Sequence, residues 1–319
     1  MSELAQGLTV KRGRHDSRAR VRVVERRELR YEPELAALVG ARWVRSGSGL
    51  LRFGRRLLLI QDDALWLPWL DDQGGLHADP LPAAGERLFD DKRRKPDFEA
   101  AALSGDRALV FGSGSLRSRE RIAVIERDGS ARLVQASALY ASLRRERRFA
   151  GADLNIEGAA VVAGRLLLCN RGNAAPGDPA ACFDATVELD AAELERYLAA
   201  PEHARVPQLG VVTQYWLGSV AGVRLTLTDA AERDGRLFYL AAAEASPDAI
   251  ADGPVTGAAL GVLEPEPRYA LIEDETGAAS CQKLEGLAAA TEPNEWLAIV
   301  DADDSGKPAE LLRLRAEGI

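Results

Sequence analysis

Four acidic residues recur at one place in a repeated phrase of this sequence, and their types and spacing could do chemistry. They are Glu99, Glu157, Asp229 and Glu285, at intervals of 58, 72 and 56 residues, and Ser48 holds the corresponding place 51 residues before the first. Carboxylates that gather around one axis raise one another's pKa or require a cation. Oxygen ligands of this kind favour Ca²⁺ over Mg²⁺. We therefore predict that these four residues are the ligands of a calcium ion.

A structural role for the same carboxylates is the alternative. Buried polar groups are usually hydrogen-bonded, often to backbone N–H groups. Basic residues that could act as counter-charges lie near the repeated phrase, namely Lys95, Arg171, Arg224 and Lys283. In this interpretation the carboxylates join neighbouring parts of the fold and bind no metal. The sequence leaves both interpretations open.

The repeated phrase itself predicts a β-hairpin: a short apolar strand, a turn with glycine, and a second apolar strand that ends in polar residues. Its clearest copy is residues 154–173, which aligns without a gap with residues 96–115. Two further strands follow in several copies, joined by Asp-Gly or Gly-Gly turns. Repeats of four antiparallel strands at intervals of roughly 40–60 residues are typical of an all-β fold, the β-propeller. We count five blades, and a sixth could lie between Glu157 and Asp229.

The two ends of the chain are predicted to complete one blade together. The fifth repeat has only three strands, of which the last is near residues 309–315, and residues 18–30 alternate apolar and charged side chains as an exposed strand does. Pairing of these two strands would close the ring and leave no free strand edge. We therefore expect a flexible basic leader, residues 1–17, and a single propeller domain, residues 18–319.

Two short helices are expected outside the strands. Residues 32–39 are one, with Pro33 near the start. The other is an insertion within the third repeat, where Asp190 and Glu193 have the form of a capping box and Pro201 ends the segment.

Polar residues at the ends of the second strands complete the predicted site. The first two strands of a blade form one antiparallel hairpin, so the start of the first lies beside the end of the second. Ser113, Asn170 and Arg171 hold such positions and are predicted to contact substrate. A loop of glycine and serine with nearby arginines can hold a phosphate or a carboxylate. A small anionic molecule is the expected ligand, and a solvated loop without a ligand is the alternative.

Composition and charge argue against several classes of partner and against export. The chain has 319 residues, 46% of them hydrophobic, and a net charge of −8, although its first 30 residues carry nine Lys/Arg and four Asp/Glu. The acidic remainder would repel phosphate, so no nucleic-acid partner is expected. No window of about 18 apolar residues predicts a membrane partner, and no signal peptide is evident. Three scattered cysteines, Cys169, Cys182 and Cys281, are expected to be free thiols in a cytoplasmic protein.

The common hydrolase motifs are missing from the sequence. No G-x-S-x-G motif is present, and the three histidines, His15, His77 and His203, lie outside the repeated phrases. Scattered His and Cys residues also argue against zinc. The carboxylates are thus the main candidates for any chemistry.

The repeated phrases resemble those of a known group of proteins. DFEA at residues 97–100, LNIEG at 154–158 and LEGL at 284–287 are similar to the E-G-[LA]-[AV] phrase of bacterial β-propellers related to the esterase-like phytases and, more loosely, to the lactonase and strictosidine-synthase-like propellers. LVFGSGS at 109–115 and CNRGN at 169–173 extend the resemblance, which covers about residues 45–315.

The resemblance implies a divalent cation, often calcium, on the propeller axis and hydrolysis of an ester, lactone or phosphoester. Carried over to this sequence, Glu157 and Glu285 would hold the ion and Arg171 would orient the substrate, which makes Glu157 and Arg171 the candidate catalytic residues. The dense basic shell that a phytate binder needs is not evident here. The alternative to such a hydrolase is a non-catalytic propeller that binds a ligand or a protein and whose ring carboxylates are structural.

Overall fold

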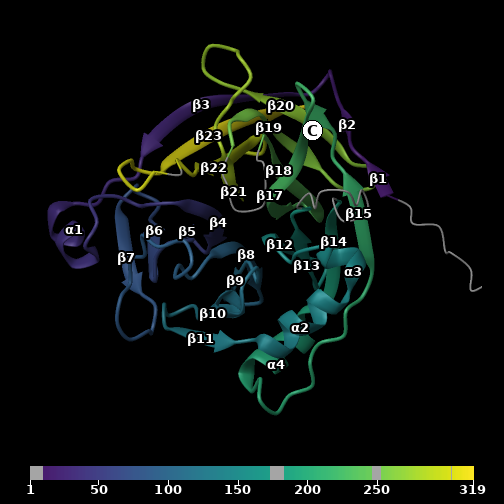
Figure 1. Cartoon of the computed structure of the whole chain (residues 1–319). Coiled ribbons are helices and arrows are strands. Elements are labelled where there is room, and N and C mark those ends of the chain that lie inside the picture. The colour runs from purple at the N-terminus through teal and green to yellow at the C-terminus, as the bar shows by residue number, and fades with distance from the viewer. Residues whose placement is uncertain (1–9, 173–182, 246–252, 303) are drawn as a thin grey trace, which may run out of the picture.

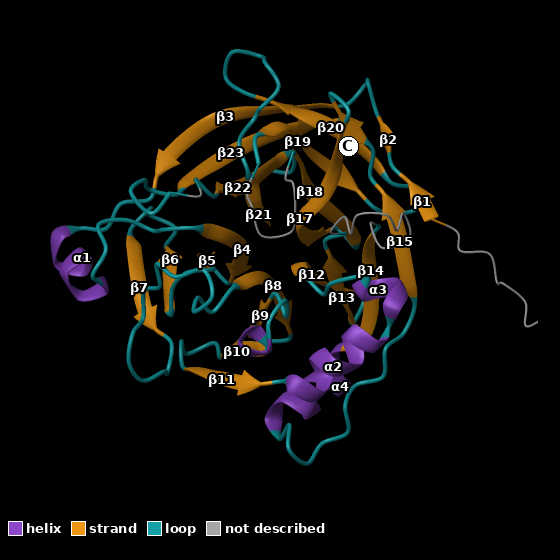
Figure 2. Cartoon of the chain, viewed as in Figure 1, coloured by secondary structure: helices purple, strands orange, loops and turns teal. Residues whose placement is uncertain are grey.

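The computed structural model describes residues 10–172, 183–245, 253–302 and 304–319, and most of its regular structure is β-strand. Figure 1 shows the strands arranged as five blades around one axis, with β4, β8, β12, β17 and β21 innermost. The fold is therefore a β-propeller, which confirms the predicted fold class and decides the blade number in favour of five. Figure 2 shows the α-helices on the outside of the ring.

Each of the five blades has four antiparallel strands, and parallel pairing between the outermost strands of the fourth and fifth blades joins these two blades into one sheet. In the first four blades the strands follow one another from the axis outward: β4 (Gly47–Phe53), β5 (Arg56–Gln61), β6 (Trp66–Leu70) and β7 (Leu76–Pro80); β8 (Phe98–Ser104), β9 (Arg107–Gly112), β10 (Arg121–Ile125) and β11 (Ala131–Gln135); β12 (Ile156–Val162), β13 (Arg165–Asn170), β14 (Asp184–Asp190) and β15 (Val212–Trp216); β17 (Val223–Arg233), β18 (Arg236–Glu244), β19 (Val255–Val262) and β20 (Arg268–Glu273). A two-residue strand, β16 (Ser219–Val220), pairs with β17.

The fifth blade joins the two ends of the chain. Its inner strands are β21 (Leu284–Ala289), β22 (Glu295–Val300) and β23 (Glu310–Glu317), and its outermost strand is β3 (Arg20–Glu28). β3 pairs antiparallel with β23 along their length, with Glu25 opposite Arg313. Figure 1 shows the purple β3 beside the yellow β23. The predicted closure of the ring by the N-terminal strand is confirmed.

The segment before β3 is also bound to the propeller. Residues 10–15, which the sequence assigns to a flexible leader, form β1 (Val10–Arg12) and β2 (Arg14–His15). β1 pairs in parallel with β15 of the third blade, and β2 pairs in parallel with β20 of the fourth. Ion pairs of Lys11 with Glu264 at 2.8 Å and of Asp16 with Arg268 at 3.0 Å add to the backbone pairing. Strands of two or three residues are too short to show the alternation of side chains that would predict them. Residues 1–9 of the predicted leader lie outside the described residues.

All five innermost strands carry a β-bulge at the same end. The residue that each bulge leaves without a partner in the register is Ser48, Glu99, Glu157, Thr228 or Glu285. The expected fourth member was Asp229, but the structure places Thr228 there and Asp229 one residue further along. In the structure, the position of the bulge in each inner strand is fixed relative to the apolar residue before it, such as Leu227 or Ile156. The repeats of the sequence were instead aligned on their acidic residue, and this alignment selected Asp229. We call Ser48, Glu99, Glu157, Thr228 and Glu285 the ring positions.

The glycine that follows the acidic residue in the repeated phrase has a packing reason. A Cβ atom on Gly158 would lie 2.8 Å from the backbone N of Ala230, and one on Gly286 would lie 2.8 Å from the Cα of Gly49. Real Cβ atoms do not approach backbone this closely. Neighbouring inner strands therefore touch at this glycine, and the phrase that predicted the fold marks contacts between blades.

In the described part of the chain, four α-helices lie outside the blades. α1 (Pro33–Val39) and α4 (Ala191–Ala199) occupy the two predicted segments, and the Asp190 side chain caps α4 by accepting from the Glu193 N–H at 2.9 Å. α2 (Ser137–Arg145) and α3 (Arg147–Ala150) lie between the second and third blades and were not predicted. Leu139, Tyr140 and Leu143 fix α2, since all three are buried in the core beneath it.

Apolar residues pack between neighbouring blades. One cluster joins Trp69 of the first blade to Phe98 and Val110 of the second, and another joins Val23 of β3 to Trp296 and Leu312 of the fifth blade and to Leu260 of the fourth. Among the described residues, none of the helices has the length and apolar character that a membrane crossing requires. Cys169 is a buried free thiol and Cys281 an exposed one, and Cys182 lies outside the described residues.

Candidate functional site at the propeller axis

Two of the five ring positions carry hydroxyl groups that link adjacent blades. Ser48 Oγ donates to the Phe98 carbonyl at 2.5 Å, and Thr228 Oγ1 donates to the Leu284 carbonyl at 2.6 Å. In each case the acceptor directly precedes the ring position of the next blade. These hydroxyls are buried and satisfied, so their role is to join inner strands.

The carboxylate of Glu99 belongs to a buried acidic cluster with Asp62 and Asp97. One oxygen from each of the three lies within 4.8 Å of the others, and no other such group of metal-ligating side chains occurs in the part of the chain that the structure describes. Lys95 is bound within this cluster: its ammonium group hydrogen-bonds to Asp62 and lies 3.1 Å from Asp97. Burial lowers the pKa of Lys95, but Asp62, Glu99 and Asp97 together raise it above its ordinary value. The lysine is therefore charged, and it partly neutralises the cluster.

Asp97 is also the partner of the predicted substrate loop. Ser113 Oγ donates to its carboxylate, and Arg119 Nη1 lies 2.8 Å from its Oδ2. Ser115 Oγ is 3.3 Å from the same oxygen. Ser113 is fully buried. The glycine- and serine-rich loop thus uses its hydroxyl groups to hold an aspartate of its own blade.

Glu157 shares its arginine with a second carboxylate. Arg171 Nη2 is 2.8 Å from Glu244, whereas Arg171 Nη1 is 3.8 Å from Glu157. Arg171 Nε also donates to Thr226 Oγ1 at 3.0 Å. Asn155 Nδ2 donates to Glu157 Oε1 at 2.5 Å. The two residues predicted to be catalytic are therefore neighbours, and Arg171 is oriented mainly by Glu244 on β18.

The two carboxylates beside Arg171 differ in their protonation. Burial raises the pKa of Glu157 to about 8, against the opposing charge of Arg171. Burial also acts on Glu244, but there Arg171 and the Gly253 N–H outweigh it and lower the pKa. The shorter ion pair thus belongs to Glu244, whose ionised form is favoured, whereas burial favours the protonated form of Glu157.

Glu285 has a lysine as its partner. Lys283 Nζ lies 2.9 Å from Glu285 Oε1 and 3.8 Å from Asp301 Oδ2. Lys283 precedes the ring position by two residues, so both side chains lie on the same side of the chain. The third acidic ring position is therefore neutralised from within its own strand.

Asp229 makes hydrogen bonds to backbone instead of joining the ring positions. Its Oδ1 accepts from the Ala230 N–H at 2.7 Å, and its Oδ2 accepts from the Leu287 N–H of the next blade at 2.7 Å. Burial raises its pKa well above the ordinary value, although both N–H groups lower it. The four residues predicted as calcium ligands thus do not form one cluster: only Glu99 belongs to the group of three described above.

Asn170, the remaining predicted substrate residue, also acts on backbone. Its Oδ1 accepts from the Asn155 N–H at 2.7 Å, and its Nδ2 donates to the Arg171 carbonyl at 3.2 Å. Arg224, a predicted counter-charge, pairs with Asp184 at 3.0 Å. Asp184 in turn accepts from the N–H groups of Gly172 and Leu227, which belong to adjacent blades.

Several residues of this network were missed by the sequence analysis, and strand periodicity could have found some of them. Side chains two residues apart share one face of a strand. The residues two before the ring positions are Ser46, Asp97, Asn155, Thr226 and Lys283, and four of these take part in the contacts above. Glu244 and Asp184 carry no such signal, because they reach the site from other strands.

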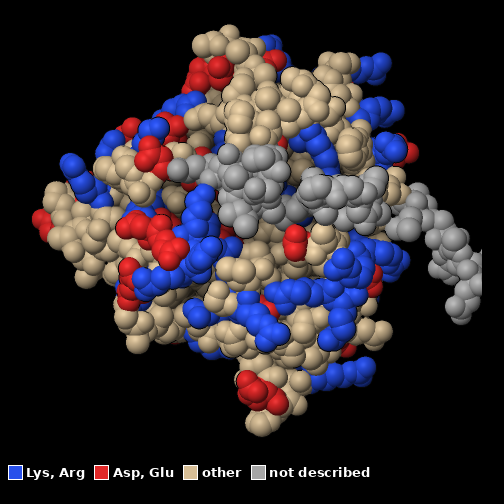
Figure 3. Space-filling model, in the orientation of Figure 1, with Lys and Arg blue, Asp and Glu red and all other residues tan. Residues whose placement is uncertain are grey.

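Charges of both signs are interspersed over the face of the molecule seen in Figure 3. Lys and Arg side chains lie among Asp and Glu side chains, and neither sign covers this face alone.

Stability is expected to fall as pH rises, because buried carboxyl groups around the axis have raised pKa values. Glu157 has a pKa of about 8 when folded and an ordinary value of 4.5. Between these values the folded chain binds a proton that the unfolded chain has lost, so unfolding becomes easier as pH increases. Up to about 1.4 kcal/mol is lost per pH unit from this one group. Thermal melts from about pH 6 to about pH 8 measure the loss.

The matched variant for this prediction is Glu157→Gln, which resembles the protonated side chain and cannot titrate. Its melting temperature should change less over the same pH range than that of the wild type. Asp63, whose pKa burial raises to about 6, acts in the same direction and remains in both proteins. Equal pH dependence in the two proteins would show that Glu157 is ionised when folded.

Sequence comparison places the chain in a family. Residues 43–316 match the family described as "Family of unknown function (DUF6929)". The chain belongs to this family. The match covers all five inner strands with their ring positions. No curated protein is significantly similar to the chain in sequence.

Solved structures resemble this member of the family in fold. The glutaminyl cyclase of Myxococcus xanthus is 11% identical, with a TM-score of 0.51, over 97% of this chain and 99% of the cyclase. A streptogramin B lyase is 10% identical, with a TM-score of 0.42, over 92% and 98% of the two chains. The virginiamycin B lyase of Staphylococcus aureus is 9% identical, with a TM-score of 0.40, over 93% and 99%. At 11% identity the likeness to the cyclase concerns the fold alone.

Proposed function

We propose that this chain is a non-catalytic binding propeller and that the carboxylates around its axis are structural. The observation that supports this is the internal pairing of the acidic ring positions. Lys95 lies among Asp62, Asp97 and Glu99, and Lys283 lies beside Glu285. Arg171 pairs with Glu244 and lies 3.8 Å from Glu157, whose protonated form burial favours. Buried charges are stable when they are paired and hydrogen-bonded. A ring neutralised in this way needs no resident cation.

The hydrogen bonds of the predicted substrate residues favour the same proposal. Ser113 donates to Asp97, Asn170 bonds to the backbone of residues 155 and 171, and Arg171 bonds to Glu244 and Thr226. A substrate at these groups would have to replace existing bonds, at a cost in binding free energy. We therefore expect ligands or partner proteins to bind away from the axis.

A calcium-assisted hydrolase for esters, lactones or phosphoesters is the second candidate, and one observation favours it. Asp62 Oδ1 is buried within the acidic cluster and, among the described residues, has no hydrogen-bond partner. Asp62, Asp97 and Glu99 offer the oxygen ligands that calcium prefers. Lys95 would then have to give up its place to the ion. In this proposal Asp62, Asp97 and Glu99 replace the four ligands expected from the sequence.

Melting in excess calcium and in excess EDTA separates the two candidates. A ligand that binds only the folded chain raises its melting temperature. For a structural ring we expect the same melting temperature in both conditions, and an equal decrease in both for Glu99→Gln. For a calcium site, calcium stabilises the wild type and Glu99→Gln abolishes this stabilisation. The second pattern would contradict the proposed function.

A further inference from the structure

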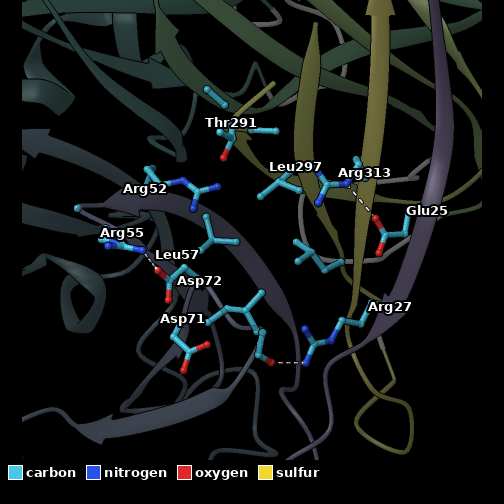
Figure 4. Close-up of a pocket in the computed structure, with 16 residues that line it drawn as sticks. Glu25, Arg27, Arg52, Arg55, Leu57, Asp71, Asp72, Thr291, Leu297 and Arg313 are labelled. Atoms are coloured by element: carbon cyan, nitrogen blue, oxygen red, sulfur yellow. Dashed lines mark hydrogen bonds and ion pairs between the residues drawn. The ribbon is translucent and has the colours of Figure 1, made fainter. Parts of the chain in front are cut away.

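A cavity away from the axis lies between the first and the last blade. Its volume is about 730 Å³, and it is lined by residues of β3, β4, β5, β21, β22 and β23 and by the turn after β6. Figure 4 shows the side chains that surround it. Ligand sites in proteins typically have volumes of roughly 300–1,000 Å³. The cavity is therefore large enough for a small organic molecule.

The inner wall of the cavity is apolar. Leu57, Leu297 and Leu311 line it and are otherwise buried in the core, with 1%, 7% and 7% of their surface exposed. In Figure 4 Leu297 lies between the side chains of Arg52 and Arg313, with Leu57 on the Arg52 side. An aliphatic group bound here would bury the part of its apolar surface that faces these leucines, which favours binding.

Most charged groups around the cavity already have partners. Arg55 pairs with Asp72, and Arg27 Nη2 donates to the Gly74 carbonyl at 2.7 Å. Arg313 pairs through Nε with Glu25 at 2.9 Å and through Nη1 with Glu295 at 3.1 Å, which leaves its Nη2 for a ligand. The carboxylate of Asp71 is occupied by its own turn: it accepts from the Gly75 N–H at 2.7 Å. The four arginines and three carboxylates that line the cavity leave one positive charge in excess.

The Arg52 guanidinium is the exception. Of all the residues that the structure describes, none forms a hydrogen bond, an ion pair or a ring contact with it. Its side chain is half-buried. Burial and the positive charge of Arg313 lower its pKa. An anion between Arg52 and Arg313 would offset both effects.

Comparison of the blades shows that this arginine is peculiar to the first one. Arg52 follows the ring position Ser48 by four residues. The residues at the same distance from the other ring positions are Leu103, Val161, Glu232 and Ala289. Regular packing of a blade therefore does not require an arginine here.

We propose that this cavity binds a small aliphatic monocarboxylate, with its carboxylate between Arg52 and Arg313 and its hydrocarbon chain on Leu57, Leu297 and Leu311. The planar fork of a guanidinium fits a carboxylate in a bidentate manner. The single excess positive charge matches one negative charge. Glu25, Asp71 and Asp72 disfavour a dianion such as phosphate. Thr291, which also lines the cavity near Arg52 in Figure 4, offers a further hydroxyl donor.

Isothermal titration of the full chain with butyrate tests this proposal. We expect binding to the wild type, and binding weaker by about tenfold or more for Arg52→Met, since a hydrogen bond to a charged group is lost. Arg52→Lys keeps the charge without the fork and should bind at an intermediate strength. Arg165→Met is the matched control, because Arg165 is exposed on the third blade, far along the chain from the cavity. It should bind butyrate like the wild type.

Two further probes decide which part of butyrate is recognised. Butyramide has the same shape as butyrate without its charge, and inorganic phosphate is an anion without the hydrocarbon chain. We expect both to bind more weakly than butyrate. The proposal is overturned if the wild type does not bind butyrate, if Arg52→Met binds it equally well, or if either probe binds as well as butyrate. The cavity and the ring are tested separately, since calcium melts report on Glu99 and butyrate titrations on Arg52.

Discussion

Replacement of Lys95 by methionine is expected to lower the free energy of unfolding by about 3–5 kcal/mol, the usual cost of removing one partner from a buried ion pair. Lys95 bonds to Asp62 and lies 3.1 Å from Asp97, and both carboxylates are buried. Without the ammonium group, Arg119 would still pair with Asp97, but Asp62 would lose the cation bonded to it and would face the carboxylates of Asp97 and Glu99. Denaturant unfolding of the two proteins measures the difference.

The control for this prediction is Lys307→Met. Lys307 also forms an ion pair, with Asp304 at 3.3 Å, but its side chain is 67% exposed. Exposed pairs contribute about 0–1 kcal/mol. Addition of Asp62→Asn to Lys95→Met should recover part of the lost stability, because it removes one of the unpaired charges. If Lys95→Met is no less stable than Lys307→Met, the lysine does not neutralise the cluster.

Deletion of residues 1–31 is expected to abolish cooperative unfolding or solubility. The deletion removes β3 and exposes the edge of β23 from Glu310 to Glu317. It also removes Val21, Val23, Leu29 and Tyr31 from the core. Burial of each such side chain stabilises the fold by roughly 1.5–3 kcal/mol, and the total stability of a domain is about 5–15 kcal/mol. A free strand edge also promotes aggregation.

A shorter deletion serves as the control. Removal of residues 1–17 takes away β1 and β2 but leaves β3 paired with β23. This variant should stay soluble and melt cooperatively at a somewhat lower temperature. A 1–31 deletion that melts like the intact chain would show that the N-terminal strand does not close the ring.

The fold could be predicted from the sequence because its signals are local and repeated. Alternating strands, glycine turns and the copy of residues 96–115 at 154–173 indicated the propeller, and the three-stranded last repeat indicated its closure. β1 and β2 were missed because strands of two or three residues are too short to show an alternation of side chains. The apolar spacing of Leu139, Tyr140 and Leu143 would have indicated α2, but it follows directly after a predicted strand.

The site was harder to predict because two of its properties depend on how strands pair within a blade and pack between blades. The bulge in each inner strand breaks the alternation at the ring position, so Thr228 instead of Asp229 occupies it. The ion pairs join residues distant in sequence, as Arg171 and Glu244 do. The counter-charges Lys95, Arg171 and Lys283 could be named from the sequence because they lie next to the repeated phrases. Arg52 was missed because it differs from the other blades only when residues at the same distance from the ring positions are compared.

Anomalous diffraction from crystals soaked in a heavy calcium substitute such as terbium tests the structural ring most directly. The account predicts no anomalous peak at the axis and an ordered Lys95 ammonium group among Asp62, Asp97 and Glu99. A peak coordinated by these three carboxylates, with Lys95 displaced, would contradict it and would favour the calcium-assisted hydrolase.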